Sequence, residues 1–217
     1  MRANTLPRSR TATLLTSAAL ASAIALTAAA CGSGSGPAQA GSHSPMHHDS
    51  PMPSHAPMHE TAVIGSDCAM MPSSGMGSLH GMSMDPVVTA AGHDPLLTTF
   101  AADVRMAGLT SDLNGMHALT VFAPDNKAFA ALSHHDMMML HSRAELAKIL
   151  KYHVVSGHVT PAQLAHGMTL TTLEGDSLKT SRMGRVYEVN NASISCGNIT
   201  TANATVYIIS KVLQPMH

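Results

Sequence analysis

Residues 119–132, LTVFAPDNKAFAAL, decide how the folded part of this chain is organised. The first residues are apolar and β-prone, which predicts a short strand, and Pro124 cannot donate a ladder hydrogen bond, so we expect the strand to end there. Asp125 is then placed to accept hydrogen bonds from the free N–H groups of a following helix. We expect this unit to bring Phe122 and Phe129 into one core, with Phe100 on the preceding helix.

Helix signals precede this unit and also follow it directly. An N-cap residue before a proline, or a capping box, predicts helix starts at Asp85-Pro86, Asp94-Pro95, Ser142 with Glu145, and Thr160-Pro161.

The last third of the chain consists instead of apolar or alternating runs of strand length, at 168–173, 177–181, 186–189, 192–196 and 204–210. The final run is mostly apolar on both alternating faces, which predicts a central strand buried on both faces. Helices first and strands after predict an α+β fold in which helices pack against a β-sheet or sandwich.

The first thirty residues have the pattern of an export signal. Three arginines precede an apolar stretch, which ends in Ala28-Ala29-Ala30-Cys31-Gly32. Small residues before a cysteine resemble a bacterial lipoprotein processing site, which predicts that Cys31 becomes the lipidated N-terminus. The alternative is an ordinary cleaved signal that leaves Cys31 as an unpaired thiol.

Charge and motif content exclude several classes of function. Residues 1–30 hold three of the twelve basic residues and no acidic one, so the processed chain has nine basic and thirteen acidic residues. That balance does not favour binding to nucleic acid. We also find no nucleophile motif, paired acids or phosphate loop, so we expect neither an enzyme nor a small-molecule substrate.

With Cys31 assigned to lipid, Cys68 and Cys196 are left. An even pair in an oxidising, exported compartment implies a disulfide, and two separate buried thiols are the alternative.

Between the signal and the folded part lies a segment rich in Gly, Ser and Pro and then in His and Met. Its prolines prevent regular helix, so residues 31–66 are predicted to be a disordered tether. Thioethers and imidazoles suit Cu(I) and Cu(II), so copper is a hypothesis here, although we expect no cofactor to be required. The alternative is a plain spacer. The hypothetical ligands are Met46, His47, His48, Met52, His55, Met58 and His59.

Methionines continue into the folded part at positions 70, 71, 76, 82 and 84, with His80 among them. A further run, residues 134–141 (HHDMMMLH), could be a second soft-metal cluster, but we favour a short helical connection whose methionines fill the core. His153 lies near a helix-to-strand junction. Because no recognisable motif supplies a catalytic partner, we expect a hydrogen-bonded structural histidine rather than a general base.

Three stretches together resemble the fasciclin domain family. Residues 120–129 (TVFAPDNKAF) resemble its first signature, residues 152–157 (YHVVSG) its Tyr-His signature, and residues 201–215 its closing strands. Within the family, residues 81–87 and 203–207 are most similar to the secreted and lipoprotein fasciclin-domain antigens of mycobacteria.

The resemblance implies an adhesion or protein-interaction module without enzymatic activity, and a bridge between Cys68 and Cys196. It also implies, weakly, a partner-binding role for Tyr152 and His153. The tether is not part of the family pattern, so its function cannot be carried over.

These observations combine into one hypothesis. Residues 1–30 are a lipoprotein-type signal, 31–66 a tether, and 67–217 a single fasciclin domain. The protein is expected on the extracellular face of the cell membrane, held by its lipid and open to shedding, where it binds an unidentified surface or matrix protein. The alternative is an envelope protein that sequesters or delivers copper through its tether.

Overall fold

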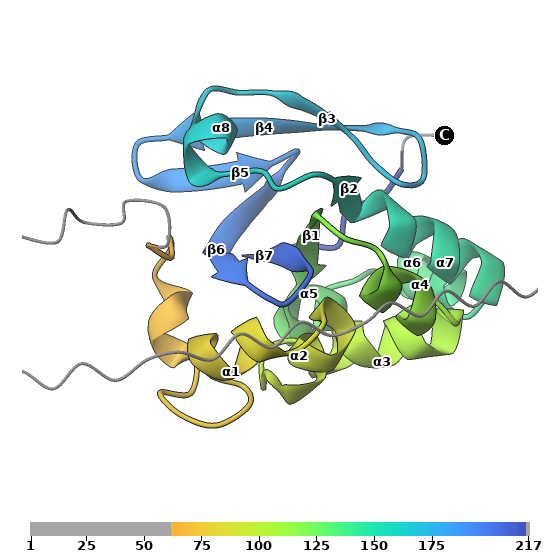
Figure 1. Cartoon of the computed structure of the whole chain (residues 1–217). Coiled ribbons are helices and arrows are strands. Elements are labelled where there is room, and N and C mark those ends of the chain that lie inside the picture. Colours follow the sequence, from red (N-terminus) through yellow and green to blue (C-terminus); the bar gives the residue numbers. More distant parts are fainter. Residues whose placement is uncertain (1–61, 216–217) are drawn as a thin grey trace, which may run out of the picture. The chain divides into compact units, whose positions relative to one another are not determined.

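The structure, a computed structural model, describes residues 62–215. Its helices are η1 (Asp67–Met70, a short 3₁₀ helix), α1 (Leu79–Met84), α2 (Val87–His93), α3 (Thr98–Ala107), α4 (Thr110–Gly115), α5 (Asn126–Ala130), α6 (His134–Leu140), α7 (Arg143–Tyr152) and α8 (Pro161–Ala165). Its strands are β1 (Leu119–Pro124), β2 (Val154–Ser156), β3 (Thr169–Thr171), β4 (Ser177–Met183), β5 (Val186–Val189), β6 (Ala192–Thr200) and β7 (Ala204–Ile209). Helices cover one side of the central strands β1 and β7. Strands β3–β5, together with α8, lie on the other side of these two strands (Figure 1).

The strands β1 and β7 run parallel at the centre of the sheet, and every residue of both is buried. Their register pairs Val121 with Val206 on the helical face and Phe122 with Tyr207 on the opposite face. The rings of Phe122 and Tyr207 stack with their centroids 5.6 Å apart. This arrangement confirms the expected central strand and gives it two buried faces, as parallel pairs normally have.

The seven strands follow the order β2-β1-β7-β6-β5-β4-β3 and curl toward closure. A bridge between Val155 and Thr172 joins the two ends, and the Leu173 amide donates to the Val154 carbonyl at 2.7 Å. The sheet is therefore a near-barrel, and one of the two apolar clusters fills its interior. That cluster includes Phe122, Tyr152, Leu164, Leu170, Leu178, Val189 and Tyr207.

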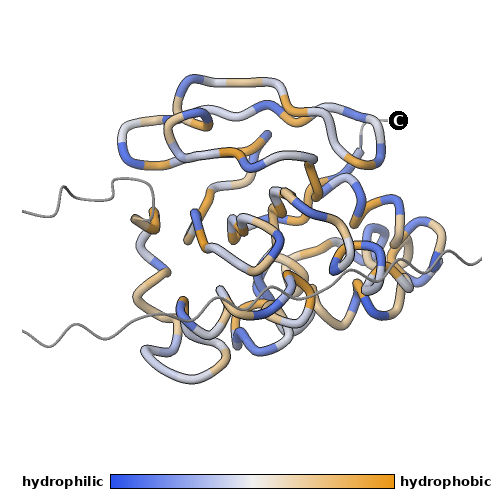
Figure 2. Tube along the Cα trace, viewed as in Figure 1, coloured by the Kyte–Doolittle hydropathy of each residue, from blue (hydrophilic) through white to orange (hydrophobic). Residues whose placement is uncertain are grey.

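The larger apolar cluster lies between the sheet and helices α1–α5 and α7. In Figure 2 these helices alternate between hydrophobic and hydrophilic residues along their length, as expected of helices with one buried face. Phe100 and Phe129 belong to this cluster, whereas Phe122 belongs to the barrel interior. The expectation that Phe122 and Phe129 share one core is therefore wrong, because β1 is buried on both faces.

The strand–proline–helix unit forms as expected. Asp125 caps α5 by accepting a hydrogen bond from the Ala128 amide at 2.6 Å. The later strands also occur where the alternation predicts them, although β4 and β6 extend further than expected, to Met183 and Thr200. The α+β class, with helices packed against a sheet, is confirmed.

Three predicted helix caps are wrong. Pro86, not Asp85, precedes α2, and α3 begins only at Thr98. Asp94 instead accepts from the Leu96 amide at 2.9 Å. The Ser142 side chain makes no cap hydrogen bond to α7. The capping box at the start of α8 is present, formed by Thr160 with Gln163.

Asparagines from distant parts of the chain cap α2 and α3 in place of the predicted aspartates. Asn203 accepts from the Val87 amide at 2.8 Å, and Asn126 accepts from the Thr99 amide at 2.9 Å. Asn203 also donates to the carbonyls of Leu113 and Met116 at 2.7 and 2.8 Å. One side chain at the start of β7 thus joins the first turn of α2 to the end of α4.

A disulfide joins Cys68 to Cys196 across 128 residues, with Cα atoms 4.9 Å apart. Beside it, Ile64 and Gly197 exchange two backbone hydrogen bonds of 3.0 and 2.7 Å, so the chain already pairs with the domain ahead of residue 67. Gly197 lies at an irregularity of β6, and a side chain there would meet the Tyr207 ring. A glycine is therefore required at this crossing.

None of the helices in residues 62–215 is long and apolar enough to cross a membrane.

Replacing Asn203 with Ala is expected to lower the free energy of unfolding by about 3 kcal/mol, because buried amide and carbonyl groups lose their partner. Urea denaturation measures the change. The matched control is Asn191→Ala at an exposed position, where the loss should stay below about 0.5 kcal/mol. Equal effects in the two variants would contradict the role of Asn203.

Candidate functional site

Tyr152 and His153, for which the family resemblance implies a partner-binding role, are both 0% exposed. The Tyr152 hydroxyl donates to the Ser177 carbonyl at 3.2 Å and accepts from the Asn190 side chain at 3.1 Å. It therefore joins the end of α7 to the β4–β5 hairpin. Buried in this way, neither side chain is available for contact with a partner, and the surface that a partner meets must be formed by other residues.

His153 is a structural link between α7 and the C-terminal segment. Its Nδ1 lies 2.8 Å from the Ile149 carbonyl, and its Nε2 accepts from the Leu213 amide at 2.9 Å. This pattern requires the neutral tautomer with the proton on Nδ1. Burial lowers the pKa of His153 from 6.5 to about 4. A histidine that is enclosed and satisfied at both nitrogens is not placed to act as a general base.

An apolar hollow of the described surface lies beside α6. A cavity of about 370 Å³ opens between α3, α6 and α7, and a second of about 170 Å³ lies on the other side of α6, against the C-terminal segment. We call the first of these the α6 groove. It is lined by Thr99, Asp103, Met106, Phe129, Leu132, Met137, Leu140, His141, Arg143 and Leu146.

Exposed methionines border this groove. Met106 on α3 is 62% exposed, and Met137 on α6 is 42% exposed. No residue of α6 is buried. The expectation that this methionine run fills the core is therefore wrong, because α6 lies outside the helical layer and only Leu140 reaches the cluster below.

Two charged residues give the groove its polarity. Burial raises the pKa of the Asp103 carboxyl, which has no hydrogen-bond partner among residues 62–215. Arg143 donates from Nε to the Ala107 carbonyl at 3.3 Å, and its guanidinium lies over Gly108 at the end of α3. The groove thus combines an apolar floor with one acidic and one basic group. Apolar pockets with a few polar groups are typical of ligand-binding sites.

No sequence pattern directly predicts this groove. Asp103 and Arg143 belong to helices that look ordinary alone, and the groove exists only because α3 and α7 pack together. The methionine run at 137–139 was the one feature of the sequence that could have indicated the groove. Because we expected these methionines to be buried, we did not predict an exposed site there.

Within the described chain, no group of three or more His, Cys, Asp or Glu side chains could hold a metal ion. The predicted lipidation residue Cys31 and the hypothetical copper ligands lie outside the described residues. These ligands are Met46, His47, His48, Met52, His55, Met58 and His59.

Comparisons with known proteins identify a family and several relatives. The model of the "Fasciclin domain" family matches residues 95–215. The immunogenic protein MPB70 of Mycobacterium bovis is 39% identical over 161 residues, which cover 70% of this chain and 82% of MPB70. The cell surface glycolipoprotein MPB83 of the same species is 39% identical over 161 residues, covering 70% of this chain and 72% of MPB83. A solved domain pair from the insect cell adhesion molecule fasciclin I shares 19% identity with a TM-score of 0.47, covering 54% of this chain and 45% of that one.

The lowered pKa of His153 makes stability depend on pH. His153 binds a proton below pH 6.5 in the unfolded state but only below about pH 4 in the folded state. The contribution of neutral His153 to the free energy of unfolding is therefore fully present above pH 6.5 and decreases as the pH falls from 6.5 to about 4. We expect the free energy of unfolding to decrease by about 2 kcal/mol from pH 7 to pH 5. Urea denaturation at both pH values measures it. In His153→Gln this difference should largely disappear, and an unchanged difference would refute the assignment.

Proposed function

This chain belongs to the fasciclin domain family, and we propose that it is a cell-surface lipoprotein whose single fasciclin domain serves as an adhesion and protein-interaction module. Members of this family are typically adhesion proteins or antigens without enzymatic activity. The relative MPB83 is a cell surface glycolipoprotein, which supports the same placement for this chain. The Cys68–Cys196 disulfide also fits a protein outside the cytoplasm.

The anchor proposal depends on Cys31. Small residues directly before it, and glycine and serine after it, resemble a lipoprotein processing site. A lipoprotein carries several acyl chains, which hold a membrane far more firmly than a single chain does. Lipidation at this cysteine would therefore decide whether the protein stays on its cell or is released.

The α6 groove is the proposed contact surface, and the observation that carries it is the gathering of exposed methionines at its border. Methionines in solvent contribute little to the stability of the monomer, yet their flexible, polarisable side chains adapt well to a partner surface. We infer that the partner is a protein that inserts apolar side chains into the groove. Asp103 lies at the groove wall and favours a basic residue of the partner beside those side chains.

Lipidation is tested by feeding expressing cells a labelled fatty acid. The full chain should incorporate the label, and Cys31→Ala should incorporate none, because the cysteine sulfur is the attachment point. Absence of label on a secreted, processed chain that retains Cys31 would refute the anchor and favour the ordinary cleaved signal.

Adhesion is tested with beads coated with residues 32–217, applied to cells of the producing bacterium and to surfaces coated with extracellular matrix. Coated beads should adhere to at least one of the two. Because a carboxylate would be desolvated by an apolar partner, we expect Met106→Glu and Met137→Glu each to reduce adhesion at least fivefold.

The matched control is Met183→Glu, on β4 and 72% exposed, which should leave adhesion unchanged. If wild-type beads adhere and the groove variants behave like this control, the contact surface lies elsewhere. If wild-type beads adhere to neither surface, the adhesion proposal fails.

A further inference from the structure

The methionines at positions 70–84 fall into two groups in the structure. Met71 and Met82 are 7% and 0% exposed and belong to the large apolar cluster, and the Met71 sulfur lies 3.8 Å from the Cys196 sulfur. By contrast, Met76 and Met84 are 57% and 72% exposed, and Met70 on η1 is 50% exposed. Core packing therefore explains Met71 and Met82 but not the exposed methionines, of which Met76 and Met84 lie close to each other in the sequence of the loop and α1.

Met76 and Met84 line one open cavity of about 490 Å³ together with His80. His80 and Met84 are four residues apart on α1, so their side chains project from the same side of the helix. Met76 comes from the loop that precedes α1. Within residues 62–215 the imidazole of His80 has no hydrogen-bond partner.

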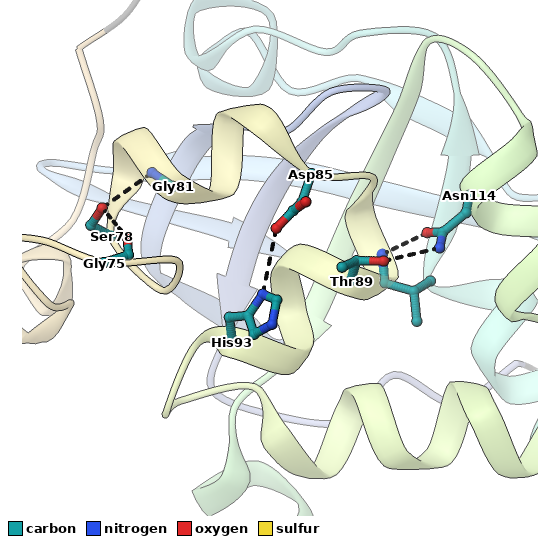
Figure 3. A network of polar contacts seen from close by, with 8 residues as sticks. Gly75, Ser78, Gly81, Asp85, Thr89, His93 and Asn114 are labelled. Carbon is teal, nitrogen blue, oxygen red and sulfur yellow. Dashed lines mark hydrogen bonds and ion pairs between the residues drawn. The ribbon is translucent and has the colours of Figure 1, made fainter.

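Hydrogen bonds hold the loop with Met76 against α1. The Ser78 hydroxyl donates to the Gly75 carbonyl at 2.7 Å and accepts from the Gly81 amide at 3.1 Å (Figure 3). Gly81 has no side chain, and a Cβ at this position would meet the Gly75 carbonyl and the Cα of Met76. The loop backbone thus lies directly on the helix, which keeps Met76 next to the helix that carries His80 and Met84.

The cavity is lined mostly by uncharged residues and has one acidic side chain. Asp85 lines it, and a carboxylate oxygen of Asp85 lies 3.5 Å from Nδ1 of His93 (Figure 3). The Asp85 side chain is 24% exposed, so its negative charge is only partly screened by water. A cation in this cavity would be favoured over a neutral or anionic ligand.

We propose that Met76, His80 and Met84 bind one soft monovalent cation, Cu(I), through two thioether sulfurs and one imidazole nitrogen. Thioethers select Cu(I) and bind Zn²⁺ or Mg²⁺ poorly, and imidazole suits copper as well. The site is independent of the His/Met-rich tether and of the α6 groove.

The site is tested by NMR of the methionine methyl groups in residues 32–217, titrated anaerobically with Cu(I) to saturation. Single Met→Leu variants assign the signals. We expect the Met76 and Met84 signals to shift together. The control signals are those of Met70 and Met183, at 50% and 72% exposure and outside the cavity, and they should stay in place. If Met76 and Met84 shift no more than these two, the proposal is overturned.

Affinity is then measured by competition with a Cu(I) chelator, in a chain whose seven hypothetical tether ligands are replaced by Leu or Asn. Two variants are made in that background: the double variant Met76→Leu with Met84→Leu, and the single variant His80→Asn. Each should weaken Cu(I) binding at least tenfold. The matched pair Met70→Leu with Met183→Leu should not. Equal Cu(I) affinity of the two methionine double variants would refute the site, whether or not the tether binds copper.

Discussion

The parallel pairing of β1 with β7 is the constraint on which the rest of this domain depends. Both strands are buried along their whole length, so neither can lie at an edge, and each of their faces needs a cover. The helices cover one face, and the curled β2–β6 strands with α8 cover the other. Because β1 and β7 are separated by about half of the domain, this pairing forms only when the intervening chain has also been placed.

Two cross-links fasten the surrounding elements to this centre. Asn203, directly before β7, joins α2 and α4 to the sheet, and the Cys68–Cys196 disulfide joins the start of the domain to β6. The elements that carry the proposed functions lie outside this frame. Helix α6 has no buried residue, and α1 buries Met82 while exposing Met84. The peripheral helices can therefore carry binding residues at little cost to the core.

Local patterns were sufficient to predict much of this architecture. The strand–proline–helix unit depends on neighbouring residues only, and the apolar run at 204–210 predicts a central strand because few other positions tolerate it. The caps of α2 and α3 could not be predicted, because their acceptors come from distant parts of the chain. Asn203, for example, lies 116 residues from the amide it caps. The prediction for Phe122 was wrong because it assigned β1 to one core only. Both faces of β1 are buried, and Phe122 faces the barrel interior while Phe129 belongs to the other cluster. The α6 groove and the Met76–His80–Met84 cavity could not be predicted either, because the sequence does not show which methionines are buried in the core.

The most direct test of the central pairing is native-state hydrogen exchange. The amide of Phe122, bonded to the His153 carbonyl at 2.9 Å, and the amides of β7 should exchange only through global unfolding. Their opening free energy should equal the free energy of unfolding measured with urea, and the amides of α6 should open at a clearly lower free energy. If the β1 and β7 amides exchanged as readily as those of α6, the account of a domain built around these two strands would be contradicted.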